Sequence, residues 1–354
     1  QGPGPAPSLS WSRPLPGTPL ETSPVIAGKR VLRASTDSTG MADRLLLLGA
    51  DGQVFALALD SGTPLWATGL DAGPHRWVGH GLGACGDQIY VRTQERIVTL
   101  ELAGGVIWDK PFVHSDWICA CGTPLCIEER LFVPAVLGHG VSCFERSTGR
   151  LLWDTRHAPG LERIWGGLAH SPGHRFILAT GVANLIGENS SRTAEGRIEP
   201  FGGMLCALNA EDGQTVWRRP VGAFNYTIPV VVGETVLLSD TVNGRLLALD
   251  VATGREPWRV LAGASLQSTA PDRRDVPSIS ASPAVGGRVV YVGASDGNLY
   301  ALDLASGAEL SRTHLGGAVA ASPALSGNGV WVATCNGRLV ALAGTATETV
   351  GRPS

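Results

Sequence analysis

A sequence unit of about forty residues recurs along the whole chain and constrains the fold more than any other feature. Residues 51–66 run from an Asp-Gly turn through an apolar stretch ending in Leu-Asp to a tryptophan, and residues 243–258 repeat this pattern from an Asn-Gly turn. Successive copies are spaced 41, 44, 64, 41, 53 and 40 residues apart. The seven anchor residues are Leu59, Leu100, Phe144, Leu208, Leu249, Leu302 and Leu342. The chain is therefore expected to fold as a repeat architecture.

Each copy of the repeat predicts four short β-strands. A Ser-Pro step precedes the first strand, as at Pro24, Pro283 and Pro323, and a short apolar run such as residues 45–48 forms the second. An Asp-Gly or Asn-Gly turn leads into the third strand, and these dipeptides are the strongest short hairpin signals. A Thr-Gly or Ser-Gly turn then leads into the fourth strand. Because no segment has helical periodicity, we expect an all-β protein.

Four-stranded units of this length are typical of propeller blades, which must pack against one another to bury their faces. We predict a single seven-bladed β-propeller over residues 9–345, with eight blades as the alternative. Residues 9–13 match the fourth-strand pattern that the last copy lacks, so we expect them to pair with that copy and close the ring. Residues 1–8 read as an expression-tag scar or a disordered N-terminus, and residues 346–354 read as a C-terminal tail.

The repeat Gly-x-Leu-Tyr-Ala-Leu-Asp, seen at residues 297–303, resembles that of pyrroloquinoline-quinone-type (PQQ-like, quinoprotein-like) propellers. In style it is most similar to non-enzymatic bacterial members, among them the propeller lipoprotein of the outer-membrane assembly machinery. The resemblance implies a binding or scaffold protein of the cell envelope or periplasm, with a cytoplasmic location as the alternative. It also implies that the tryptophans closing each copy are packing residues. These are Trp11, Trp66, Trp108, Trp153, Trp217 and Trp258.

Quinone-dependent dehydrogenases of the same family carry a vicinal cysteine pair against the cofactor and are usually eight-bladed. The nearest pair here, Cys119 and Cys121, is separated by an alanine. We therefore expect no quinone, and no other cofactor is implied by the sequence.

The loops between the fourth strand of one copy and the first strand of the next are the predicted binding site, because in propellers they reach the mouth of the central channel. Their tryptophans offer stacking surfaces for a flat or sugar-like ligand, and Arg76 and Arg163 can hold an anion by charge-assisted hydrogen bonds. The alternative is that these side chains plug the channel and pair with one another. The predicted ligand-binding residues are His75, Arg76, Trp77, Trp117, Arg163, Trp165 and Asn225.

An enzyme acting on a small molecule is the alternative function, and it requires acid–base side chains that converge in one pocket. The candidates are His80, His114, Asp116, His170, Tyr226 and Glu21. No Gly-x-Ser-x-Gly elbow, phosphate-binding loop or His-Glu-x-x-His motif accompanies them. The residues alone leave the choice between binding module and enzyme open.

Metal-capable side chains gather between residues 75 and 143, where His75, His80, Cys119 and Cys121 are weak candidate ligands. Their spacing differs from the Cys-x2-Cys of structural zinc sites, so we expect no metal. Cys119, Cys121 and Cys126 are expected to be buried thiols or, in an exported protein, to include a disulfide. Cys126 is expected in a core strand.

Charge and hydropathy argue against nucleic-acid binding and against a membrane-spanning helix. The 28 basic and 31 acidic residues give a net charge of −3, so no broad basic surface for nucleic acid is expected. No apolar run approaches the roughly 18 residues of a membrane-spanning helix. We expect a monomer whose partner is a protein or a small molecule at the channel mouth. The polar insertions at residues 184–203 and 262–280 are expected to be loops.

Overall fold

The computed structural model describes strands and turns over most of the repeats. The described residues are 25–27, 45–50, 52–58, 63–70, 81–93, 96–112, 124–134, 140–156, 158, 160–161, 163–182, 203–221, 227–241, 244–263, 279, 281–319, 322–326, 329–334 and 339–343. Within these ranges every regular element is a β-strand, as the turn signals predict. Among them there is no helix long and apolar enough to cross a membrane.

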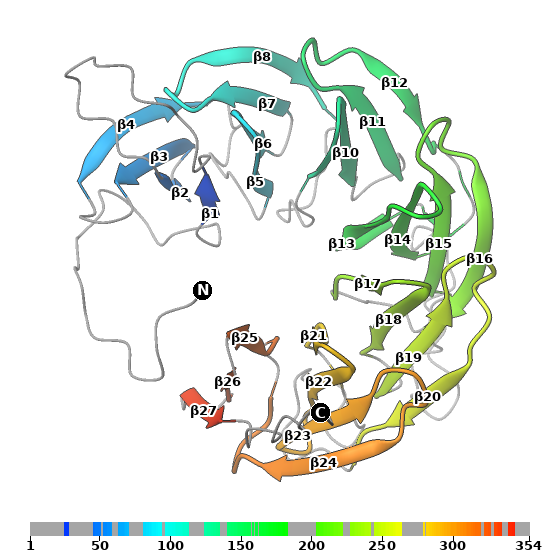
Figure 1. Cartoon of the computed structure of the whole chain (residues 1–354). Helices are drawn as coiled ribbons and strands as arrows, with labels where there is room; N and C mark the ends of the chain where they lie inside the picture. Colours follow the sequence, from blue (N-terminus) through cyan, green and yellow to red (C-terminus); the bar gives the residue numbers. More distant parts are fainter. Residues whose placement is uncertain are drawn as a thin grey trace, which may run out of the picture. The chain divides into compact units, whose positions relative to one another are not determined.

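The chain divides into two compact units, Leu9–Val221 and Gly222–Ser354 together with Gln1–Ser8. Each unit consists of antiparallel sheets whose strands follow one another in chain order (Figure 1). We call them the first and the second unit.

The first unit contains four sheets of four strands each. The first sheet consists of β1 (Val25–Ala27), β2 (Leu45–Ala50), β3 (Gln53–Ala58) and β4 (Pro64–Gly69). The second consists of β5 (Gly81–Cys85), β6 (Gln88–Arg92), β7 (Arg96–Glu101) and β8 (Val106–Pro111). The third consists of β9 (Leu125–Ile127), β10 (Arg130–Pro134), β11 (Val141–Glu145) and β12 (Leu151–Asp154). The fourth consists of β13 (Arg163–Ser171), β14 (Phe176–Val182), β15 (Gly203–Asn209) and β16 (Thr215–Val221).

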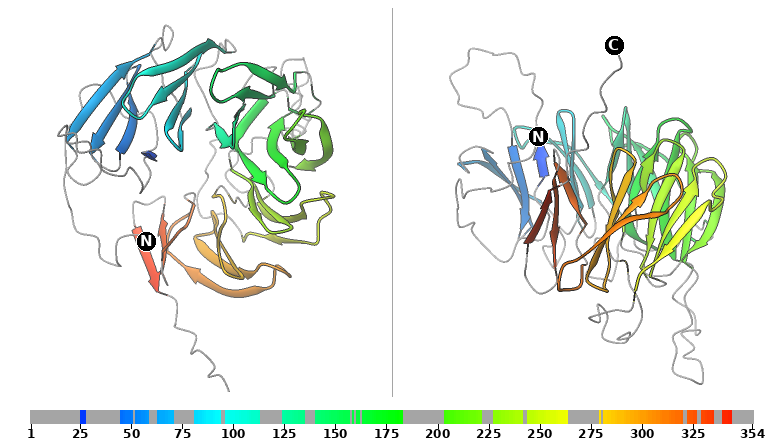
Figure 2. Two further views of the ribbon diagram at one scale, coloured as in Figure 1. Left: turned by 45° about the horizontal axis from the view of Figure 1, so that its top comes forward. Right: turned by 60° about the horizontal axis from the view of Figure 1, so that its bottom comes forward.

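The second unit contains two sheets of four strands and, within the described residues, one of three. The first consists of β17 (Val230–Val232), β18 (Thr235–Asp240), β19 (Arg245–Asp250) and β20 (Trp258–Leu261). The second consists of β21 (Ala284–Gly286), β22 (Val289–Gly293), β23 (Asn298–Asp303) and β24 (Glu309–His314). The third consists of β25 (Ala324–Ser326), β26 (Gly329–Ala333) and β27 (Leu339–Ala343), and it contacts its neighbour through β21 and β25 (Figure 2).

The predicted strands and turns are confirmed, whereas the number of blades in a closed ring stays a prediction. Residues 9–13, the predicted closing strand, lie outside the described residues, as does nearly all of the insertion at 184–203. The turns joining the first to the second and the third to the fourth strand share one end of each sheet, which we call the hairpin end. We call the opposite end the loop end.

A register shift recurs between the third and fourth strands at the repeat anchor. It lies between Thr99 and Leu100, and also between Cys143 and Phe144, among others. A bulge of this kind strengthens the twist of the fourth strand. In these sheets the anchor read from the sequence marks the place where the fourth strand bends.

The tryptophan that closes a repeat joins its sheet to the next one. Trp66 Nε1 donates a hydrogen bond to the Leu102 carbonyl at 2.9 Å, and Trp108 Nε1 donates to the Arg146 carbonyl at 2.8 Å. A glycine at positive φ lies on each ring: a Cβ added to Gly104 would stand 2.7 Å from Trp66, and one added to Gly149 would stand 2.6 Å from Trp108. Trp153 and Trp258 make the same contacts with Ala210 and Leu304. The packing role of these four tryptophans is confirmed.

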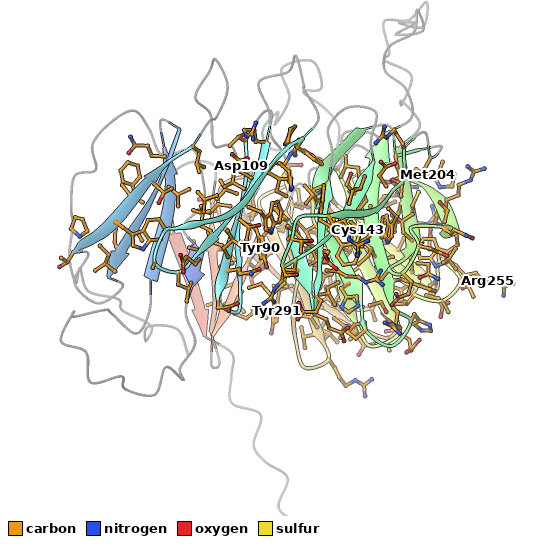
Figure 3. All side chains as sticks on the ribbon, turned by 90° about the horizontal axis from the view of Figure 1, so that it is seen from above. Tyr90, Asp109, Cys143, Met204, Arg255 and Tyr291 are labelled. Carbon is orange, nitrogen blue, oxygen red and sulfur yellow. A yellow bond between two sulfur atoms is a disulfide. The ribbon has the colours of Figure 1, made fainter. Side chains whose placement is uncertain are left out.

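The apolar core lies between neighbouring sheets. Ala56 of β3, Leu82 of β5 and Val98 of β7 belong to one cluster, and Phe132 of β10, Ile164 of β13 and Cys206 of β15 belong to another. Cys143 belongs to the second cluster and, with Tyr90, is labelled in Figure 3. A sheet buried on both faces needs short continuous apolar runs rather than strict alternation, which the strands of this chain provide.

Candidate binding site

Most residues of the predicted site lie outside the described part of the chain, so their grouping stays a prediction. They are Glu21, His75, Arg76, Trp77, His80, His114, Asp116, Trp117, Cys119, Cys121, Asn225 and Tyr226. Three further candidates fall on one strand, β13. Of Arg163 and Trp165 the backbone position is described, and of His170 the side chain as well.

Strand β13 separates Arg163 from His170. Arg163 pairs with Val182 at the loop end, and His170 pairs with Ile177 beside the turn at the hairpin end. Seven residues of extended chain span roughly 20 Å. The local sequence predicts one loop for both residues, because nothing in it marks where this strand begins. A small ligand held by Arg163 is therefore out of reach of His170.

His170 belongs to a charged cluster at the hairpin end between the third and fourth sheets, formed by Glu128, Arg130, His170, Arg175 and Glu211. The Glu211 carboxylate pairs with both Arg130 of β10 and Arg175 of the β13–β14 turn. Arg130 Nη1 also donates to the Ala210 and Glu211 carbonyls, at 2.8 and 2.9 Å. One carboxylate thus bridges cations from two sheets.

Burial lowers the pKa of His170 below its ordinary value, and Arg175 acts in the same direction, whereas the charge of Glu128 opposes them. The imidazole is therefore neutral at pH 7. It can donate and accept hydrogen bonds at this surface without adding charge to the cluster.

Two residues at this end adopt a backbone conformation that favours glycine. Glu128 has φ 51° and Arg175 has φ 55°, in the turns that precede β10 and β14. The corresponding turns before β18 and β22 place Gly233 and Gly287 at positive φ. A non-glycine residue in this region costs roughly 1–2 kcal/mol. Such strain clusters at functional positions, and here it holds two long charged side chains.

Exposed apolar side chains lie at the same end of three fourth strands. Val106 of β8, Leu151 of β12 and Val216 of β16 are 54%, 44% and 48% exposed. Val106 and Leu151 pair with the anchor residues Leu100 and Phe144, next to the turn. The hairpin end of the first unit therefore carries both exposed apolar side chains and the charged cluster.

The loop end of the first unit holds a buried cation that the sequence analysis missed. Arg92 ends β6 with 1% exposure, and its guanidinium lies 5.5 Å from the centre of the Phe112 ring. Burial lowers the pKa of Arg92 to about 10. Phe112 directly precedes residues 113–123, which contain His114 and Asp116. No local pattern distinguishes this arginine from a surface one, because only the fold buries it.

Polar groups at the loop end of the second unit join neighbouring sheets. The Ile228 amide donates to Ser282 Oγ and the Ser282 amide to Ser322 Oγ, each at 3.0 Å. Within a single sheet, Asp240 of β18, which is 0% exposed, forms an ion pair with Arg245 of β19. The Ser-Pro steps of the repeat thus serve hydrogen bonds between sheets.

The structure corrects the cysteine prediction. Cys126 lies in a strand, as expected, but it forms a disulfide with Cys85 of β5 rather than with Cys119 or Cys121. It is half-buried, not a free core thiol. Sequence reasoning missed Cys85 because 41 residues separate the pair and only the packing of two sheets brings them together. In the described residues no three His, Cys, Asp or Glu side chains group as a metal site.

Comparison with known proteins identifies relatives of this fold. A family model described as outer membrane protein assembly factor BamB matches residues 50–198 and 138–350. The BamB of Bordetella pertussis is 24% identical over 227 residues, which are 55% of this chain and 56% of that protein. The chain thus aligns with about half the length of this curated relative.

Two solved structures share the fold. The crystal structure of BamB from Moraxella catarrhalis superposes with a TM-score of 0.61 and 17% identity, covering 93% of this chain and 84% of that one. The Dos1 propeller superposes with a TM-score of 0.63 and 12% identity, covering 84% of this chain and 75% of that one. The predicted all-β propeller fold and the PQQ-like repeat are confirmed.

Proposed function

Because the chain belongs to the family of the outer membrane protein assembly factor BamB, we propose that it is a bacterial protein-binding scaffold rather than an enzyme. A protein partner docks on the hairpin end of the first unit. The observation that carries this proposal is the combination there of three exposed apolar side chains with the bridged charged cluster.

The chemistry of this surface fits a folded protein partner better than a small substrate. Exposed apolar groups supply the area that loses water on binding, and the bridged arginines give directional charge contacts at the edge. Glu128 and Arg175 lie in short turns between paired strands, so little backbone entropy is lost there on docking. The disulfide between Cys85 and Cys126 fits an oxidising compartment such as the cell envelope.

A photo-crosslinking amino acid at Val106 or Val216 tests the docking surface in cells of the source bacterium. The matched control is Leu261, which is 65% exposed but lies at the loop end of β20. We expect a discrete cross-linked protein from Val106 and Val216, lost when Glu211→Arg is added, and none from Leu261. Equal cross-linking from Leu261, or cross-linking unaffected by Glu211→Arg, would contradict the proposed surface.

The residues predicted from the sequence for the channel mouth, other than His170, are the proposed site for the alternative function, an enzyme or a small-molecule receptor. Native mass spectrometry of the purified protein, with metal analysis of the same sample, separates the two functions. A bound small molecule or stoichiometric metal lost on His80→Ala or His114→Ala would replace the scaffold proposal.

A further inference from the structure

The disulfide between Cys85 and Cys126 joins two neighbouring sheets of the first unit. Cys85 is the last residue of β5 and Cys126 the middle residue of β9, with Cα atoms 6.2 Å apart. Both side chains are half-buried at the hairpin end. Both cysteines pack against the apolar cluster that contains Tyr90 and Trp108, and neither residue is fully buried.

An arginine lies beside both sulfur atoms. Arg146 Nη1 is 3.9 Å from Cys85 Sγ and 3.9 Å from Cys126 Sγ. The same nitrogen donates to the Glu128 carbonyl at 3.4 Å, and Nη2 pairs with Asp87 at 3.2 Å. The Arg146 side chain is only 18% exposed, so its charge acts on the sulfur atoms with little screening by water.

The repeat does not require an arginine at this position. The carbonyl of Arg146 accepts the hydrogen bond of Trp108, and the residues that do the same for other repeat tryptophans are Leu102, Ala210 and Leu304. Three copies thus have an apolar residue where this copy has a cation. Placing a guanidinium in a half-buried site has a desolvation cost. The ion pair with Asp87 and the hydrogen bond to the Glu128 carbonyl offset part of that cost.

Tyr90 completes the surroundings of the pair. Its hydroxyl lies 4.0 Å from Cys126 Sγ and donates to Gln88 Oε1 at 2.8 Å. Burial raises the pKa of Tyr90 well above its usual range, so the hydroxyl stays neutral. The sulfur atoms therefore face a cation and a neutral hydroxyl, a setting that favours a thiolate when the bond opens.

We propose that Cys85–Cys126 is a thiol–disulfide exchange site for small thiols, with Arg146 stabilising the departing thiolate. The thiolate of one external molecule attacks one sulfur atom, forming a mixed disulfide and breaking the Cys85–Cys126 bond. The other cysteine leaves as a thiolate beside Arg146. A second external thiol attacks the mixed disulfide, releasing the second cysteine and an external disulfide. Two electrons and two protons pass from the external thiols to the protein.

Two other cysteines serve as internal controls. Cys143 and Cys206 are buried thiols outside any disulfide, 0% and 1% exposed. Burial raises the pKa of Cys143 to about 12, which keeps it as an unreactive thiol. Labelling of these residues reports unfolding rather than exchange.

The test uses the full-length protein purified in air and treated with reduced glutathione at several pH values, followed by alkylation and peptide mass spectrometry. The variant Arg146→Leu has the residue that two other repeats carry at this position and is expected to fold. We expect wild-type protein to open Cys85–Cys126 while Cys143 stays unlabelled. In Arg146→Leu we expect glutathione to cleave the disulfide about threefold more slowly at pH 7. We also expect the pH midpoint for alkylation of the reduced cysteines to rise by about one pH unit.

A second variant keeps the proposal testable if the first is unstable. Asp87→Asn removes the exposed carboxylate that pairs with Arg146, and we expect it to speed cleavage and shift the alkylation profile downward. Alkylation pH profiles that match wild type in both variants would overturn the proposal. So would a disulfide that opens only when Cys143 is also labelled, or Cys85 and Cys126 that remain reduced in air.

Discussion

The contact between a turn glycine and a repeat tryptophan can be tested within a single sheet. Gly287 and Gly307 lie in the two hairpin-end turns of the β21–β24 sheet, with φ of 61° and 71°. An added Cβ at Gly287 meets nothing within 4 Å, whereas one at Gly307 would stand 2.6 Å from two carbon atoms of Trp258. Substitution by alanine therefore has the same backbone effect at both positions, and only the substitution at Gly307 adds a clash with the Trp258 ring.

The expected loss of stability is the sum of a backbone cost and a packing cost. Alanine in the left-handed region costs roughly 1–2 kcal/mol at either position. Forcing a methyl group into a packed ring costs about 1–3 kcal/mol more. We expect Gly287→Ala to lower the free energy of unfolding by about 1–2 kcal/mol and Gly307→Ala by about 2–5 kcal/mol.

Urea unfolding followed by circular dichroism measures both variants, and a double-mutant cycle isolates the ring contact. In a Trp258→Ala background the extra cost of Gly307→Ala should disappear, leaving only the conformational cost shared with Gly287→Ala. Equal destabilisation by the two glycine variants in the wild-type background would refute the reasoning. A cost of Gly307→Ala that persists without the tryptophan would refute it as well.

Three further predictions concern single groups. Glu128→Gly should raise the free energy of unfolding by about 1 kcal/mol in urea titrations, because it removes left-handed strain, whereas Glu129→Gly should not stabilise. The pKa of His170 is lower in the folded than in the unfolded protein, so the free energy of unfolding falls as the pH drops below about 6.5. Between about pH 7.5 and 5.5, His170→Gln should therefore lose less of its free energy of unfolding than wild type, measured in the same titrations. Arg245→Met should cost about 2–4 kcal/mol in thermal and urea unfolding because it leaves the buried Asp240 without its ion pair, and Asp240→Asn in the same chain should recover part of that loss.

The disulfide shows how a local reading of cysteines fails. Cys119, Cys121 and Cys126 are close in sequence, and the sequence predicts that they are buried thiols or, in an exported protein, include a disulfide. Cys126 instead faces Cys85, because two inner strands of neighbouring sheets bring residues 41 positions apart into contact. The arginine beside them could not be anticipated either, since Asp87 and the Glu128 carbonyl, which its side chain contacts, come from two different sheets.

The sequence by itself determined the strands, the turns and the repeat. Turn type depends on neighbouring residues such as the glycines at positive φ, and a tryptophan at a constant offset marks the fourth strand, so both can be read locally. The fold class followed because such units can be buried only against copies of themselves.

Only the tertiary structure decided which charges meet and which side chains stay exposed. Glu211 bridges arginines from two sheets, and Arg92 becomes buried although its sequence surroundings resemble those of a surface residue. His170 and Arg163 lie at opposite ends of one strand, which no spacing rule indicated. These placements depend on how whole sheets stack, and the stacking is set by apolar contacts between residues that are distant in the chain.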